Sequence, residues 1–370
     1  MLKNKKLVLQ IAAVFIGTIV GAGLASGQEI TQFFTVYGGM SMWGILICFI
    51  LYLILGKIVI NISLHFKISS YKELIEIVSK GFLGKFIDIS TGFFLISSSA
   101  IILAGSGSLL KEYFHCSRWV GIIIMALISL YVLLRNTKGL IEINSFIVPS
   151  LISIILISFT LYIIFWKDNI NLIKLFTIPS KSNFYVLYYI SKFKLNFLGR
   201  YIILISSLLY AGFNILSCSG VLVPLSEEIK DKKSLIMGVF LGALGLTCLT
   251  LIMNFLLLIN QPYIYKYDIP MLYIVNRFGK LIQIMLLCVI WLEMFSTEVS
   301  DIYSLGKTME KSLNIKYKLS VIIIIIIAVP ISQIGFVSLI SILYPLYGVI
   351  SFIFMVQCII FYLKRKKELE

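Results

Sequence analysis

Residues 21–30 have the sequence GAGLASGQEI, and residues 220–229 have the sequence GVLVPLSEEI. A constant offset of 199 residues aligns Gly21 with Gly220 and Glu29 with Glu228, so the two segments occupy corresponding places in the chain. The first contains three glycines within seven residues, each of which costs a helix about 1 kcal/mol relative to alanine. The second contains a proline, which removes a backbone donor. Because both lie in long apolar runs, the sequence predicts two interrupted membrane helices.

Composition places the whole chain in a membrane. It has 370 residues, of which 59% are hydrophobic and 13% charged. A soluble domain carries about a quarter charged residues, and half that density cannot cover the surface of so large a globule. A β-barrel would show short alternating segments rather than unbroken apolar runs, so the expected class is an all-α polytopic membrane protein.

Ten spans are predicted, each long enough for a hydrocarbon core of about 30 Å or nearly so. They cover residues 7–37, 39–64, 86–110, 119–134, 143–166, 200–229, 234–259, 281–306, 319–331 and 336–363. Spans 1–5 form a first half at residues 1–166, and spans 6–10 with a tail form a second half at residues 200–370. Residues 167–199 are expected to be an external connection. Five spans separate the two copies, so the halves run in opposite directions, which indicates inverted repeats.

The basic residues predict the orientation. The formal net charge is +15, which in a soluble protein would suggest nucleic acid; here the charge lies between apolar runs, and membrane topology explains it better. With the N-terminus inside, 20 of the 32 Lys and Arg residues fall in inner segments and 11 in outer ones. We therefore expect a multi-pass protein of the cytoplasmic membrane, with both termini cytoplasmic, in contact with membrane lipid and not with nucleic acid.

The first interruption suits ligand binding. Unwound backbone within a membrane must be satisfied by protein, water or ligand. Its amides suit a carboxylate, and its carbonyls suit a cation. Close packing of small residues is the alternative interpretation, but packing needs no ionisable neighbour such as Glu29.

The segment GTIVGAGLASGQEI at residues 17–30, with Phe33, Phe34 and YGG at residues 37–39, resembles the YkvI-like bacterial membrane proteins. More distantly, it is similar to the amino acid–polyamine–organocation superfamily, whose members share the leucine-transporter fold of five plus five inverted helices. The closer resemblance covers essentially the whole chain. It implies a fold with helices 1 and 6 broken, and a mechanism, but no particular solute.

By this resemblance, the first break forms a substrate cradle and the sixth span forms the opposing wall. The implied substrate-binding residues are Gly21, Ala22, Gly23, Leu24, Ser26, Gln28, Glu29, Asn214, Ser217, Ser219 and Gly220. For Ser217 or Ser219 taken alone, a hydrogen bond between helices is an equally good explanation.

The eighth span carries a second polar pattern. Glu293, Ser296, Thr297 and Ser300 fall within a narrow arc at helical spacing, with Glu293 near mid-span. An ionisable group there costs about 2.5–3.5 kcal/mol, so it should face a cavity or a partner. In sodium-coupled relatives, hydroxyls of this span meet carbonyls of the first break, which implies a coupling-ion site at Ala22, Glu293, Ser296, Thr297 and Ser300. Glu298 and Asp301 are expected to be interfacial charges.

The predicted function is a secondary active transporter of a small amino-acid-like solute, working by alternating access. In some sodium-independent members of the resembled superfamily, a lysine on the fifth span replaces the ion. The fifth span of this chain has no lysine before its end, which favours sodium as the coupling ion, whereas Glu293 leaves coupling to protons as an alternative. No cofactor or metal is expected beyond a sodium ion. The alternative is a membrane receptor for a small nutrient, of the germinant-receptor type, without efficient transport. A membrane enzyme lacks a catalytic pair, and the sequence does not determine the oligomeric state.

Overall fold

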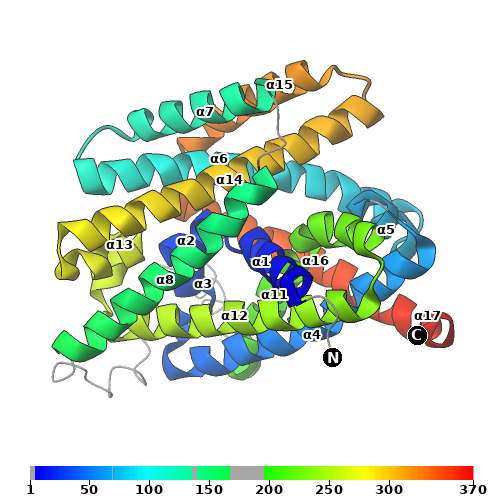
Figure 1. Cartoon of the computed structure of the whole chain (residues 1–370), viewed down its shortest axis with the longest axis horizontal. Helices are drawn as coiled ribbons and strands as arrows, with labels where there is room; N and C mark the ends of the chain where they lie inside the picture. The colour runs from blue at the N-terminus through cyan, green and yellow to red at the C-terminus, as the bar shows by residue number, and fades with distance from the viewer. Residues whose placement is uncertain (1–4, 69, 136–139, 167–195, 370) are drawn as a thin grey trace.

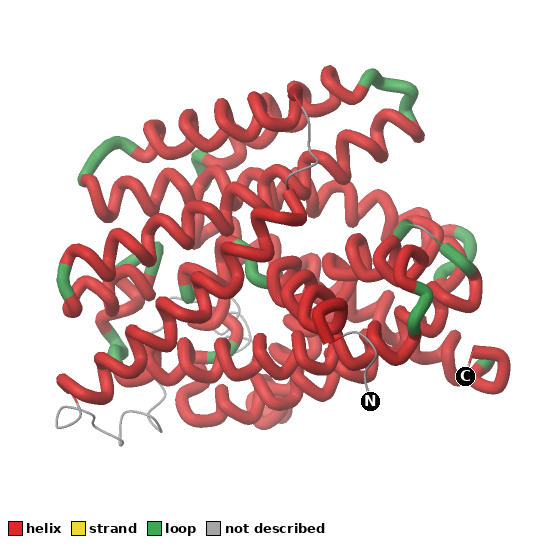
Figure 2. Tube along the Cα trace, viewed as in Figure 1, coloured by secondary structure: helices red, strands yellow, loops and turns green. Residues whose placement is uncertain are grey.

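The computed structural model describes residues 5–68, 70–135, 140–166 and 196–369. These residues form helices joined by short turns, and they contain no strand (Figure 2). The helices of the first half are α1 Lys5–Ile19, α2 Ala22–Ser26, α3 Gln28–Phe33, η1 Thr35–Met40, α4 Ser41–Phe66, α5 Tyr71–Val78, α6 Phe82–Phe114, α7 Arg118–Arg135 and α8 Leu140–Trp166. Those of the second half are α11 Asn196–Ile229, α12 Lys232–Ile259, η3 Tyr263–Lys266, α13 Pro270–Val275, η4 Asn276–Phe278, α14 Lys280–Ser312, α15 Tyr317–Ser332, α16 Phe336–Lys364 and α17 Lys366–Leu369.

The predicted spans correspond to these helices. Among the described residues, seven helices are long and apolar enough to cross a membrane, and α7 and α15 supply two shorter apolar ones. The first predicted span corresponds to α1, α2 and α3 together. The short helices α5 and α13 were not predicted. The expected connection at residues 167–199 lies outside the described residues, except where α11 begins at Asn196.

The first span is interrupted as predicted. Helix α1 ends at Ile19, and α2 begins at Ala22 after an extended Gly21. A second change of direction occurs at Gly27, whose φ of 84° is left-handed and therefore suits glycine. The glycines thus divide the first span into three helical pieces.

The sixth span requires a correction, because α11 continues as one helix through the predicted break at residues 214–220. Only Gly220 is a glycine in this stretch, so the helical penalty is far smaller than at residues 21–27. Ser219 and Ser226 donate their hydroxyls to carbonyls of their own helix, at 2.6 and 2.7 Å. Pro224 removes one backbone donor, and a single missing hydrogen bond does not end a helix packed on several sides.

The packing of the helices repeats between the halves. Pairing α1 with α11, α4 with α12, α6 with α14, α7 with α15 and α8 with α16 converts each major contact into another contact that is also present. The contact of α4 with α11 thus matches that of α12 with α1, and the contact of α8 with α14 matches that of α16 with α6. This correspondence is the structural form of the inverted repeat.

Two groups of helices flank the centre. Helices α4 and α12 run along the lower edge of Figure 1 and α7 and α15 along the upper edge, with α1, α11 and α16 between them. Helix α12 packs closely on α1 at two glycines. A methyl group added at Gly238 would overlap Ile11, and one added at Gly242 would press against Phe15. Such contacts allow helices to associate through close packing in lipid, where apolar burial supplies no driving force.

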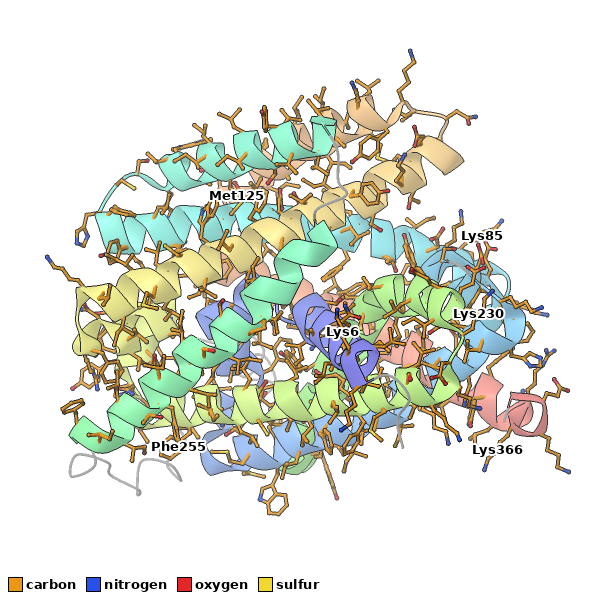
Figure 3. The ribbon with its side chains drawn as sticks, in the orientation of Figure 1. Lys6, Lys85, Met125, Lys230, Phe255 and Lys366 are labelled. Carbon is orange, nitrogen blue, oxygen red and sulfur yellow. The ribbon has the colours of Figure 1, made fainter. Side chains whose placement is uncertain are left out.

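Basic side chains gather at one end of the molecule. Lys85, Lys230 and Lys366, which belong to three separate segments, all lie at the right-hand end in Figure 3. The C-terminus lies at the same end. Lys6, which belongs to the same predicted inner group, lies near the middle of the view in Figure 3, and the cytoplasmic placement of the right-hand end remains a prediction.

Candidate functional site

The candidate site begins at the gap between α1 and α2. The Val20 amide completes α1 by donating to the Ile16 carbonyl at 2.8 Å, and the Ala25 amide donates to the Gly21 carbonyl at 3.0 Å. Within the described residues, no backbone hydrogen bond connects the amides of residues 21–24 with α1. The carbonyls of the last turn of α1 therefore lack helical donors. Ala22 starts α2, so the free carbonyls belong to residues 17–20 rather than to Ala22.

Glu29 lies against the other side of the gap. Its side chain is 2% exposed and folds back over Gly23, where any Cβ atom would overlap the carboxyl group. The Leu24 amide lies within hydrogen-bonding reach of this carboxyl. Tyr210 of α11 donates its hydroxyl to Glu29 Oε2 at 3.3 Å, and the Tyr344 hydroxyl of α16 is also within reach. Glu29 thus occupies the amide side of the break.

Polar groups extend from Glu29 across the core. The Asn214 amide donates to the Tyr52 hydroxyl at 3.0 Å, and Asn214 also reaches Tyr210. We call Tyr52, Asn214, Tyr210, Glu29 and Tyr344 the buried polar chain. It joins α4, α11, α3 and α16, so the sixth span meets the first through the side chains of Asn214 and Tyr210.

Helix α14 brings its polar face to the same gap. A Cβ atom at Gly21 would lie 3.9 Å from Thr297 Cγ2, which is ordinary contact. Glu293 lies one turn earlier on this face, is 0% exposed, and has no hydrogen-bond partner for either carboxyl oxygen. Ser296 is buried nearby, whereas Ser300 is exposed and donates to the Ser296 carbonyl at 2.8 Å.

The remaining predicted residues are divided between the site and its surroundings. Ala22, Leu24, Ser26 and Gln28 are all buried. Ser26 donates to the Gly23 carbonyl at 2.9 Å and accepts from the Gln28 amide at 3.2 Å, which stiffens the link between α2 and α3.

On α11, the nearest neighbour of Gly220 is Tyr71 of α5, and Ser219 is bonded to its own helix. The Ser217 hydroxyl is buried without a partner. These three residues therefore do not join the buried polar chain.

One acidic group was wrongly expected at the membrane interface. Glu298 is 0% exposed and accepts a hydrogen bond from Ser99 of α6 at 2.8 Å, whereas Asp301 is half-buried beside Ser98. The small-residue surface of α6 allows this burial. Tyr210 and Tyr344 were missed as well, because isolated tyrosines in apolar runs carry no sequence pattern.

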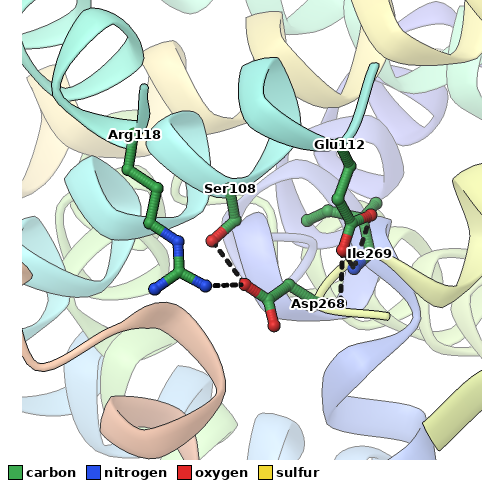
Figure 4. A network of polar contacts seen from close by, with 5 residues as sticks. All are labelled: Ser108, Glu112, Arg118, Asp268 and Ile269. Atoms are coloured by element: carbon green, nitrogen blue, oxygen red, sulfur yellow. Dashed lines mark hydrogen bonds and ion pairs between the residues drawn. The ribbon is translucent and has the colours of Figure 1, made fainter. Parts of the chain in front are cut away.

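A separate polar network fixes the segment between α12 and α14 (Figure 4). Asp268 Oδ2 accepts from Ser108 at 2.7 Å and from Arg118 at 3.0 Å. The Glu112 carboxylate accepts hydrogen bonds from the backbone amides of Asp268 and Ile269. The ends of α6 and α7 thus hold the start of α13, and we call these five residues the α13 latch.

Comparison with solved structures identifies the fold. The chain is similar to Mhp1 in an inward-facing conformation, with a TM-score of 0.62 and 14% identity over 97% of this chain and 77% of that one. It is also similar to Mhp1, a nucleobase-cation-symport-1 family transporter, in a closed conformation with bromovinylhydantoin bound, with a TM-score of 0.52 and 14% identity over 87% of this chain and 70% of that one. The protein is a multi-pass membrane protein with the leucine-transporter fold.

Sequence comparison identifies the family. The chain is 31% identical over 346 residues to the uncharacterised membrane protein YkvI of Bacillus subtilis (strain 168), covering 94% of this chain and 93% of the relative. It is 24% identical over 353 residues to the uncharacterised protein YyaD of the same strain, covering 94% and 95%. No family model matches the chain. The chain belongs to the YkvI family of membrane proteins.

Proposed function

We propose that the protein is a secondary active transporter that moves a small amino-acid-like solute by alternating access, coupled to sodium or protons. The observation that carries the proposal is the gap at Gly21, where free backbone groups meet buried Glu29 and the polar face of α14. Unwound backbone at mid-bundle is where transporters of this architecture bind solute and ion. Mhp1, which has the same fold, is described as a cation symporter, and this is consistent with the proposal.

The solute presents an amine to Glu29. In the sequence-based hypothesis, the amides of the break bind a solute carboxylate. Glu29 already covers Gly23 and reaches the Leu24 amide, so a solute carboxylate would have to compete with the Glu29 carboxyl for the same donor. A protonated amine instead gains a charge-assisted hydrogen bond to Glu29, beside the phenols of Tyr210 and Tyr344.

The coupling ion binds on the α1 side of the gap. The carbonyls of residues 17–20 lack helical donors, Thr297 of α14 lies against Gly21, and Glu293 lies one turn before Thr297 on the same helix. Oxygen ligands of this kind suit a hard cation. Ser296 is close enough along the helix to contribute, whereas Ser300 is exposed and in this conformation is directed elsewhere.

Movement between two helix groups opens and closes the site. One group contains α1, α4, α11 and α12, which pack on one another, and the other contains α6, α7, α14 and α15. The Gly21–Thr297 contact lies between the groups. Rocking of one group against the other therefore separates the two halves of the ion site and exposes it to alternate sides.

Thermal stability of the purified protein against a panel of amino acids and amines, with and without sodium, tests the proposal. A ligand that binds only the folded state raises stability by mass action. We expect a shift from at least one amine-bearing solute, strengthened by sodium and lost in Glu29→Gln. Glu228→Gln is the matched control, because it removes an exposed carboxylate from the aligned position of α11.

Uptake into proteoliposomes then separates transport from signalling. We expect accumulation of the stabilising solute against its gradient. Stabilisation without any accumulation or exchange would contradict transport and favour the receptor alternative. No shift from any amine, together with a shift from simple carboxylates, would contradict the role of Glu29.

A further inference from the structure

A pocket of about 320 Å³ lies where two membrane spans end, and it shares no residue with the break. Phe66 and Ile68 line it from the end of α4 and the turn that follows, and Phe361 and Arg365 line it from the end of α16. The third wall is α5, which lies at the right-hand end in Figure 1, as does α17. Because α4 and α16 are long enough to span a membrane and end here, the pocket lies at the depth of lipid headgroups.

Helix α5 presents charged residues to the pocket and apolar residues to the protein. Glu73, Glu76 and Ile77 are three and four residues apart, so they share the face of α5 that lines the pocket. Leu74 and Ile75, on the other side of the helix, are 0% exposed. An amphipathic helix at the end of membrane spans is typical of a segment that lies in the headgroup region.

Hydrogen bonds fix α5 in its place. Ser70 accepts from the Glu73 amide at 3.3 Å and so caps the first turn. At the other end of the helix, the Ser79 hydroxyl donates to the side-chain oxygen of Gln357 in α16. The wall formed by α5 is therefore tied to the wall formed by α16.

Charges of both signs surround the pocket. Arg365 lies over two aromatic rings, with Cζ 5.9 Å from the centroid of Phe66 and 5.2 Å from that of Phe361, and this stacking orients the guanidinium. Lys80 supplies a second cation, and α5 supplies the two carboxylates. Among the described residues, neither Arg365 nor Lys80 forms an ion pair with a carboxylate. Both cations are thus available to an anion from outside the chain.

We propose that this pocket binds the headgroup of phosphatidylethanolamine. In this assignment the lipid phosphate accepts from Arg365 and Lys80, and the lipid ammonium donates to Glu76. Ile360 and Leu363, which flank the pocket residue Phe361 in the sequence of α16, are exposed apolar side chains suited to acyl chains.

The mixed charge selects this headgroup among phospholipids. The carboxylates of α5 disfavour a lipid that carries only negative charge, such as phosphatidylglycerol. A choline headgroup has no N–H group to donate to Glu76. The proposal concerns a site at the membrane surface, and it does not depend on the identity of the transported solute.

Native mass spectrometry of the full-length protein with phosphatidylethanolamine, phosphatidylglycerol or phosphatidylcholine of matched acyl chains tests the site. We expect phosphatidylethanolamine to bind most tightly. Glu76→Gln should weaken its binding by up to about fivefold, as expected for one exposed charge pair, and should not weaken binding of phosphatidylglycerol. Arg365→Gln should weaken binding of both lipids, because both carry the phosphate.

Glu228→Gln and Lys366→Gln are the matched controls, because both residues are exposed and neither lines the pocket. Both variants should keep the wild-type order of affinities. Equal affinity of wild type for the three lipids would overturn the assignment. A preference for phosphatidylethanolamine that persists unchanged in both Glu76→Gln and Arg365→Gln would overturn it as well.

Two further measurements sharpen the result. If Arg365→Gln does not fold, Arg365→Lys keeps the charge and should keep most of the binding, and complete loss of binding in that variant would contradict the phosphate contact. Soluble phosphoethanolamine in excess should not displace the lipid, since it lacks the acyl chains. Full displacement would show that the pocket takes a soluble zwitterion, and the lipid assignment would be wrong.

The variant Glu29→Gln separates this site from the proposed function. It should lose the thermal shift caused by a solute and keep the preference for phosphatidylethanolamine, because Glu29 lies at the break and does not line the pocket. Failure of the protein to transport any solute, together with a lipid preference that Glu76→Gln removes, would refute the proposed function and support the lipid site.

Discussion

Residues 21–30 and 220–229 align with four identities or near-identities, yet they fold differently. The first breaks into three helical pieces, and the second is the end of one continuous helix. Glu29 is buried against Gly23, whereas the aligned Glu228 is exposed at the far end of α11. Gly21 faces Thr297 across the gap, and Gly220 faces Tyr71 of α5.

The difference shows that summed helix propensity does not decide where this membrane helix breaks. Three glycines weaken the first segment by about 3 kcal/mol relative to alanine, and one glycine and one proline weaken the second by a similar amount. What distinguishes the first segment is the left-handed Gly27 and the close approach of the Glu29 side chain to Gly23. A symmetric architecture therefore contains an asymmetric site. Backbone groups come from the first half, and the second half contributes side chains such as Tyr210, Asn214 and Thr297.

Removing the two aligned carboxylates should give the largest contrast. Glu29→Gln removes a buried charged acceptor worth about 1.5–3 kcal/mol, so solute affinity should fall roughly 10- to 100-fold. Glu228→Gln should leave affinity and stability within about 0.5 kcal/mol of wild type. Titration of the thermal shift with solute measures both, and equal losses in the two variants would show that burial of Glu29 is irrelevant to binding.

Adding a methyl group to one glycine of each segment should change the free energy of unfolding in opposite directions. Gly23→Ala forces the Glu29 carboxyl to move, and overpacking of this kind costs about 1–3 kcal/mol. At Gly220 the nearest neighbouring atom is 4.0 Å away, so Gly220→Ala should stabilise the helix by up to about 1 kcal/mol. Unfolding midpoints in detergent compare them, and stabilisation by Gly23→Ala would mean that Glu29 does not lie where described.

Removing each of two hydroxyls of α14 in turn should show which of them belongs to the ion site. Thr297→Ala removes an oxygen beside the gap, so the sodium-dependent part of the thermal shift should weaken by about 1 kcal/mol. Ser300→Ala should leave it unchanged, because Ser300 is exposed, whereas Thr297 lies against Gly21 at the gap. The reverse order would move the cation site towards Ser300.

Restoring the missing donor in α11 should have the smallest effect. Pro224→Ala allows residue 224 to donate to the Gly220 carbonyl, which should stabilise the protein by about 1 kcal/mol. Because α11 is already continuous, sodium dependence should not change. A loss of sodium dependence in this variant would reveal the Gly220 carbonyl as an ion ligand.

The sequence predicted the spans, their order and the first break, because apolar length and clustered glycines act locally. It did not predict the environment of Glu298 and Asp301. Helical spacing places them off the Glu293 face, but only the packing of α6 shows that Ser98 and Ser99 meet them. Tyr210 and Tyr344 were missed for a similar reason, since their partner Glu29 lies more than a hundred residues away in sequence. The break expected in the sixth span was wrong, because Gly220 does not take the left-handed conformation of Gly27 and α11 stays helical through Pro224.

The α13 latch has a mechanical consequence. The segment it holds joins α12, in one helix group, to α14, in the other, yet its bonds go to α6 and α7 of the second group. During a rocking motion, residues 268–275 would move together with the second group and could not extend to lengthen the connection between the two groups. Angular displacement would then concentrate in the few residues after Ile259. This short pivot would set how far the two groups can part.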